Sequence, residues 1–125
     1  MKIHQPIFID NRPGGKISPE IVAKDWGYEV VIHNSPDYCM KILNIQEGKE
    51  LRPHLHLAKR ESWYVAEGRA LILYSKNRND YQQLLEEGES FQIPPGLIHS
   101  VQGMNGPVKI IEASTQHFDE DSIRI

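Results

Sequence analysis

The chain has 125 residues and a mass of 14.4 kDa, with a formal net charge of −3 and a pI of about 6.0. This length predicts a single domain that is large enough to bury a core. The acidic balance, without any basic stripe, argues against nucleic acid as a partner.

The apolar runs are short, and the longest of them, such as residues 70–74, have the length of a strand, so we expect no membrane span. The chain opens with Met-Lys-Ile-His-Gln-Pro, which lacks the apolar stretch of a secretory signal. A single cysteine, Cys39, cannot form a disulfide within the chain, and a cytoplasmic location fits this.

Residues 1–25 are rich in proline and glycine, and we expect them to form an irregular N-terminal arm. Within the arm, Ile7–Ile9 is a candidate short strand. Residues 19–24 are a candidate single turn of helix, because Ser18 can cap it and Pro19 suits the first helical position. The folded domain is then expected over residues 26–125.

From residue 26 onward, runs of alternating apolar and polar residues are separated by turn residues. We expect strands at Tyr28–His33, Tyr38–Ile45, Leu51–Leu57, Glu61–Ala66, Ala70–Ser75, Tyr81–Leu85, Ser90–Ile93, His99–Gln102 and Val108–Ser114. Many short strands at near-regular spacing, with little helix between them, predict an all-β sandwich or barrel.

Histidines and a glutamate recur at a spacing that suits a metal site. His54 and His56 are two residues apart, so on a strand both imidazoles leave the same face. Glu61 follows after a turn, and His99 begins a later strand behind a Pro-Pro-Gly turn. Imidazoles with one carboxylate form a ligand set for a divalent transition metal, and Zn, Mn, Fe, Co and Ni all accept it.

These residues belong to two longer patterns. Residues 48–68 contain Gly-x5-His-x-His-x4-Glu-x6-Gly, and residues 88–99 contain Gly-x5-Pro-x-Gly-x2-His. Together they resemble the two motifs of the cupin superfamily. The resemblance implies a jelly-roll (double-stranded β-helix) cupin barrel in which His54, His56, Glu61 and His99 bind one metal ion.

The flanking residues narrow the resemblance. Trp26-Gly-Tyr-Glu, Tyr38-x-x-Lys41, Glu61-Ser-Trp63, Gly88-Glu-Ser and Ile110-Ile-Glu-Ala are similar, in this order, to stretches of the cupin domain of type II phosphomannose isomerases. This resemblance implies a metal-dependent enzyme that interconverts mannose 6-phosphate and fructose 6-phosphate.

Strand parity suggests which other residues surround the metal. Lys41 lies on the otherwise apolar face shared by Cys39, Leu43 and Ile45, and Glu112 shares a face with Val108 and Ile110. We expect Lys41 and Glu112 to serve as catalytic proton-transfer groups, with a purely structural Lys41–Glu112 ion pair as the alternative.

Three further residues are candidates for substrate binding. Parity places Arg52 inward beside His54, and Arg60 lies next to Glu61, so either cation could bind a phosphate. Trp63 shares the face of Glu61 and is expected to form a wall of the site. His4, His33 and His117 are expected at the surface, and Asp119-Glu-Asp is expected to form a solvated tail.

The sequence leaves three functions open: a sugar or sugar-phosphate isomerase or epimerase, an iron-dependent dioxygenase, and a non-enzymatic module that binds a metal and a carbohydrate. We rank the isomerase first because motif and flanking residues agree. Apolar residues on both faces of Ala70–Tyr74 favour a homodimer.

Overall fold

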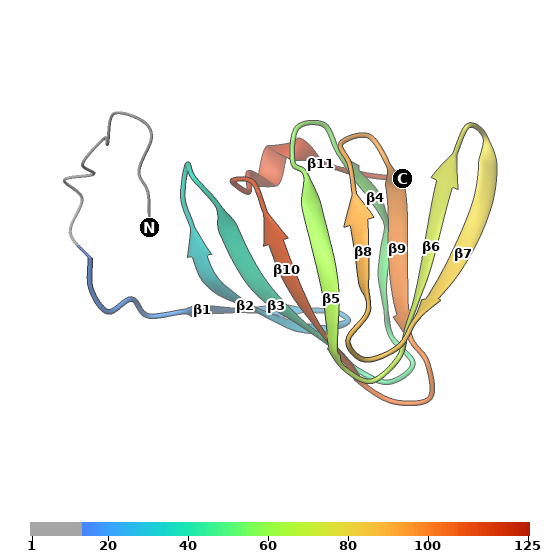
Figure 1. The fold of residues 1–125 in the computed structure, drawn as a ribbon, viewed down its shortest axis with the longest axis horizontal. Coiled ribbons are helices and arrows are strands. Elements are labelled where there is room, and N and C mark those ends of the chain that lie inside the picture. Colours follow the sequence, from blue (N-terminus) through green and yellow to red (C-terminus); the bar gives the residue numbers. More distant parts are fainter. Residues whose placement is uncertain (1–13) are drawn as a thin grey trace, which may run out of the picture.

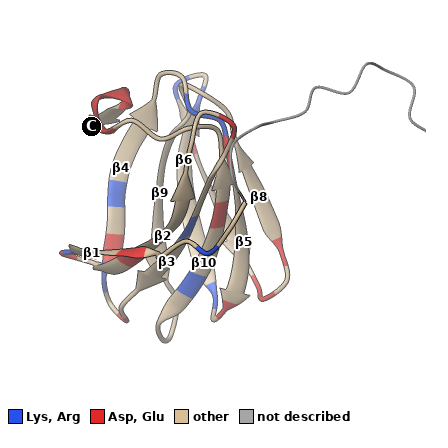
Figure 2. Cartoon of the chain, turned by 90° about the vertical axis from the view of Figure 1, so that its left-hand side faces the viewer, with Lys and Arg blue, Asp and Glu red and all other residues tan. Residues whose placement is uncertain are grey.

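The computed structural model describes residues 14–125, which form two antiparallel β-sheets packed face to face (Figure 1). The six-stranded sheet has the order β1-β2-β3-β10-β5-β8, and the five-stranded sheet has the order β11-β4-β9-β6-β7. Figure 2 shows the arrangement from the side, with β4, β9 and β6 facing β10, β5 and β8. The expected all-β jelly roll is confirmed.

The strands of the six-stranded sheet are β1 (Glu20–Lys24), β2 (Gly27–Asn34), β3 (Cys39–Ile45), β10 (Val108–Ser114), β5 (Glu61–Glu67) and β8 (Ser90–Ile93). Those of the five-stranded sheet are β11 (Ser122–Arg124), β4 (Glu50–His56), β9 (Ile98–Gly103), β6 (Ala70–Lys76) and β7 (Asn79–Leu85). A 3-10 turn, η1 (Asp119–Asp121), precedes β11. None of the described helical segments is long and apolar enough to cross a membrane.

All nine strands expected after residue 26 are present, and β8 and β10 have the expected bounds. These strands could be predicted because buried and more exposed residues alternate along them, as β3 and β10 show. The core between the sheets is built from Trp26, Leu43, Ile45, Trp63, Val65, Ala70, Ile72, Leu85, Ile93, Val101, Val108 and Ile110. Cys39 is a buried free thiol, as expected.

The helix expected at residues 19–24 is wrong, because Glu20–Lys24 is a strand. It pairs with β2 from Glu20↔Val31 to Lys24↔Gly27, and these ladder bonds satisfy the backbone groups that a single helical turn would leave unpaired. The six-stranded sheet therefore begins before residue 26, where we expected the domain to start. The candidate strand Ile7–Ile9 lies outside the described residues.

Gly27 closes the β1–β2 hairpin in a conformation that other residues avoid. Its φ is 147°, and a Cβ atom at this position would collide with the backbone oxygen of Asn44 on β3. We expect Gly27→Ala to lower the free energy of unfolding by about 2–3 kcal/mol, because it adds backbone strain to a clash with a central strand. Chemical denaturation measures this change. Gly14→Ala is the matched control, because a Cβ atom there meets no atom within 4 Å; equal losses in both variants would contradict the steric explanation.

Candidate metal centre

The three histidines of the two motifs meet at one point between the sheets. His54 and His56 lie on β4, and His99 lies on the neighbouring strand β9, where its Cα is paired with that of His54. One nitrogen from each ring lies within 4.8 Å of the others. Three imidazoles this close can hold one metal ion.

The rings of His54 and His99 are oriented by backbone carbonyl groups. Nδ1 of His54 lies 2.8 Å from the carbonyl oxygen of Arg52, and Nδ1 of His99 lies 2.8 Å from that of Leu97. A carbonyl oxygen only accepts hydrogen bonds, so each Nδ1 carries the proton and each Nε2 keeps a free lone pair. This is how histidine ligands are commonly oriented for a metal.

Glu61 reaches the cluster from the opposite sheet. It is the first residue of β5, and its carboxylate oxygens lie 3.3 Å from Nε2 of His56 and 3.8 Å from Nε2 of His99. Within residues 14–125, neither oxygen of Glu61 has a hydrogen-bond partner, nor does Nε2 of His99 or Nδ1 of His56. Buried polar atoms without partners are costly, and a cation among them would relieve that cost.

The electrostatics of the cluster also suit a cation. Burial lowers the pKa of His56 to about 3 and that of His99 to about 4, so both rings are neutral and keep a lone pair at neutral pH. Burial, together with the nearby Glu112 carboxylate, raises the pKa of Glu61 to about 8. The two neutral rings therefore offer lone pairs to a cation, and further positive charge beside Glu61 would favour ionisation of its carboxyl group.

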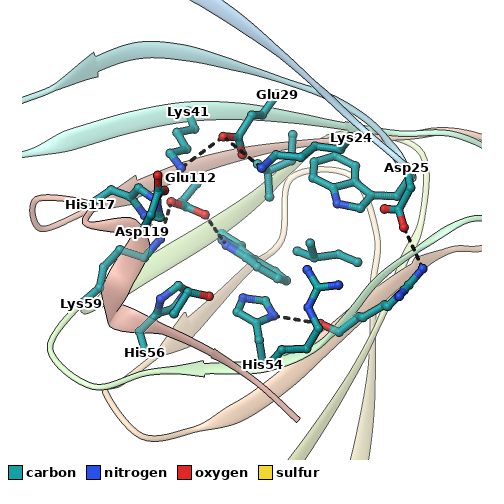
Figure 3. A pocket seen from close by; sticks show the side chains of 17 residues that line it. Lys24, Asp25, Glu29, Lys41, His54, His56, Lys59, Glu112, His117 and Asp119 are labelled. Atoms are coloured by element: carbon teal, nitrogen blue, oxygen red, sulfur yellow. Dashed lines mark hydrogen bonds and ion pairs between the residues drawn. The ribbon is translucent and has the colours of Figure 1, made fainter.

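A cavity of about 180 Å³ opens beside the cluster (Figure 3). Its lining comprises Lys24, Asp25, Trp26, Glu29, Lys41, Leu43, Leu51, Arg52, His54, His56, Lys59, Trp63, Glu112, His117, Asp119, Ser122 and Arg124. Most of these side chains are charged or can ionise, so the cavity is suited to a polar ligand.

Residues 15–125 match the family described as Mannose-6-phosphate isomerase C-terminal. The chain belongs to this family. A mannose-1-phosphate guanylyltransferase from Salmonella muenchen is 28% identical over 107 residues, which make up 83% of this chain and 22% of that protein. The chain thus spans about a fifth of the length of this curated relative.

Solved structures show the same fold at low sequence identity. The capsular polysaccharide assembling protein CapF from Staphylococcus aureus superposes with a TM-score of 0.78 at 18% identity, covering 88% of this chain and 35% of that one. Oxalate decarboxylase from Bacillus subtilis gives 0.78 at 16% identity, covering 90% and 33%. KdgF from Halomonas sp. gives 0.70 at 15% identity, covering 83% and 92%. At these identities the likeness establishes the cupin fold.

Lys41 and Glu112 do not form the ion pair that we considered as the alternative to their catalytic role. Nζ of Lys41 lies 3.4 Å from Glu29 on β2, which sequence reasoning did not single out. Glu112 instead accepts hydrogen bonds from Lys59 at 3.1 Å and from the indole of Trp63 at 3.2 Å. Figure 3 shows Lys41 and Lys59 on either side of Glu112.

Lys59 is a second residue of the site that sequence reasoning did not select. Its side chain is 3% exposed, and Nζ lies 3.4 Å from Glu61 as well as beside Glu112. Burial favours the neutral amine, but the two carboxylates outweigh it and raise the pKa of Lys59. Burial likewise opposes ionisation of Glu112, yet Lys59 and Lys41 lower its pKa. The sequence offered one signal for this role, because Lys59 stands two residues before the motif glutamate Glu61.

The loop that carries Lys59 is held by the acidic segment before β11. The carboxylate of Asp121 accepts hydrogen bonds from the backbone N–H groups of Ala58 and Lys59 at 2.8 and 2.9 Å. The expectation that Asp119-Glu-Asp is only a solvated tail is therefore wrong for Asp121.

His117, which we expected at the surface, lines the cavity and contacts Lys59 at 3.3 Å and Asp119 at 2.9 Å. His33 is half-buried against Tyr38, and His4 lies outside the described residues.

The candidate substrate residues are not equally near the cavity. Trp63 is buried in its wall, as expected. Arg52 lies at the rim, 58% exposed and paired with Asp25 at 2.8 Å, because a shift in register between Leu51 and His54 breaks the alternation we relied on. Arg60 is exposed and does not line the cavity.

Proposed function

We propose that this cupin is a metal-dependent isomerase or epimerase that acts on a sugar or sugar phosphate, similar to mannose-6-phosphate isomerase. The observation that carries the proposal is the histidine cluster, which faces the oxygens of Glu61 beside a cavity lined by charged groups; among the described residues these oxygens accept no hydrogen bond. Membership of the family supports the choice of a sugar substrate.

We propose one divalent transition metal ion held by His54, His56 and His99, with Glu61 as a fourth ligand. The donor set fits such an ion, because the rings are neutral, two are oriented by carbonyl groups, and the carboxylate lies against two of them. A bound ion would supply Lewis-acid polarisation of a sugar carbonyl.

Isomerisation also requires a proton to move between neighbouring carbons, and the residues around Glu112 suit this step. Lys59 and Lys41 keep Glu112 ionised, so that its carboxylate can accept a proton from a substrate held in the cavity. Lys59 stays protonated between two carboxylates and can donate a hydrogen bond or a proton to a substrate oxygen. We assign Lys41 a supporting role, because Glu29 already pairs with it.

The test combines metal analysis with turnover. The purified protein is loaded in turn with Zn, Mn, Fe, Co and Ni, its metal content is measured by mass spectrometry, and mannose 6-phosphate is followed by NMR. We expect fructose 6-phosphate to appear with at least one metal, and Glu112→Gln to slow its appearance by at least about 100-fold. Absence of product with every metal in a fully loaded protein would reject the isomerase and leave a binding module. Oxygen uptake by the iron-loaded protein would favour a dioxygenase instead.

The expected homodimer and the cytoplasmic location stay predictions. Leu71 and Leu73 are half-buried on the face of β6 that points away from Ala70 and Ile72, which leaves them available for a contact between two copies.

A further inference from the structure

Within residues 14–125, one cation of the cavity differs from the others because no carboxylate pairs with it. Lys24 and Lys41 contact Glu29, Arg52 contacts Asp25, Lys59 contacts Glu112, and His117 contacts Asp119. Arg124 also lines the cavity, yet no carboxylate among residues 14–125 lies within ion-pair distance of its guanidinium. Among the described residues, Arg124 is therefore the one Lys or Arg of the cavity without a carboxylate partner, while Lys24 and Lys41 share the carboxylate of Glu29.

The backbone at Arg124 is held beside the histidine cluster, and its side chain is exposed. It lies on β11, which pairs with β4 so that Ser122 faces His56 and Arg124 faces His54. Backbone hydrogen bonds from Leu57 to Asp121 and from Ile125 to Pro53 hold the strand at both ends. Ser122 and Arg124 share one face of β11, and both line the cavity, so this strand brings a hydroxyl and a guanidinium beside two of the three imidazoles.

A guanidinium that pairs with no carboxylate among residues 14–125 and lines such a cavity is suited to an oxyanion. Its planar donors match two oxygens of a phosphate or carboxylate at once, which a neutral hydroxyl group cannot reproduce. Every other Lys or Arg of the cavity already contacts a carboxylate, although Lys24 and Lys41 share that of Glu29, so the guanidinium of Arg124 is the group whose donors are left for an incoming anion.

We propose that Arg124 binds the anionic group, phosphate or carboxylate, of the ligand that occupies this cavity, and thereby selects anionic sugars over neutral ones. The proposal rests on the proposed function for the nature of the ligand, but it concerns binding and requires no turnover.

The test compares affinities for four probes in the metal-loaded protein by titration calorimetry: mannose 6-phosphate, mannuronate, inorganic phosphate and mannose. We expect mannose 6-phosphate or mannuronate to bind at least about tenfold more tightly than mannose, and the tighter of the two identifies the anionic group. Arg124→Met should remove this preference, and Arg124→Lys should retain part of it, because it keeps the charge without the planar fork. Arg69→Met is the matched control: Arg69 is an exposed arginine paired with Glu86, outside the cavity lining.

Two results would overturn the proposal. One is wild-type protein that binds mannose as tightly as both charged sugars. The other is an undiminished preference in Arg124→Met protein that still binds the metal. If the charged sugars bind through Arg124 but are never interconverted, the isomerase proposal fails and the anion site stands. If Arg69→Met loses the preference as well, the effect is general electrostatics and the assignment to Arg124 is wrong.

Discussion

Lys59→Met is expected to lower the free energy of unfolding by about 3–5 kcal/mol, the largest stability effect we foresee from one substitution. The reason is that Lys59 is the countercharge of Glu112 and also contacts Glu61, and all three side chains are almost fully buried. Removal of its ammonium group leaves the Glu112 carboxylate without its nearest cation and with little water to solvate it. Urea denaturation of the metal-free protein at neutral pH measures this loss.

Two further variants separate the buried charge from other causes. Lys109→Met removes a lysine that is 3.4 Å from Glu67 at the surface, and it should cost less than about 1 kcal/mol. Glu112→Gln, added to Lys59→Met, should recover part of the lost stability, because it removes the buried carboxylate that has lost its countercharge. Equal losses for Lys59→Met and Lys109→Met would show that burial of the pair carries no special weight.

His99→Ala is expected to weaken metal binding by more than about 100-fold, a larger loss than that caused by removing an outer hydrogen-bond partner of a ligand. His99 is buried, and its Nδ1 donates a hydrogen bond to the carbonyl oxygen of Leu97. Its Nε2 has no hydrogen-bond partner among the described residues. Titration with zinc, read by calorimetry and by the rise in melting temperature that binding to the folded state produces, measures the change.

His33→Ala is the control for this variant. His33 lies on β2, packs against Tyr38 and does not line the cavity, so its loss should leave zinc affinity within about twofold of wild type. If His99→Ala protein remains folded and still binds zinc as tightly as His33→Ala protein, the three histidines do not form the metal site.

The strands and the histidine cluster could be predicted because both depend on short-range patterns. Inward residues of β3, β5 and β10 alternate with outward ones, and the sequence shows this period of two as alternating apolar and polar residues. His54 and His56 are two residues apart on one strand, so they share a face wherever that strand lies. The resemblance to the two cupin motifs then implied that His99 and Glu61 would meet them.

The errors occurred where strand pairing or register decides the outcome. Ser18 and Pro19 are typical of the start of a helix, but residues 20–24 instead pair with the edge of β2 as a strand. Arg52 moved to the rim because the ladder between β4 and β9 shifts by one residue, a feature that alternation within β4 cannot reveal.

The sequence by itself determined an all-β chain with three imidazoles and a carboxylate at the spacing of a metal site, because strand periodicity and motif spacing are local properties. Only the tertiary structure decided how the charges around that site are paired: Lys59 with Glu112, Lys41 with Glu29, and Arg124 with no carboxylate among the described residues. The physical reason is that an ion pair depends on distances between side chains from different strands. Those distances are fixed by the order and register of strands far apart in the chain.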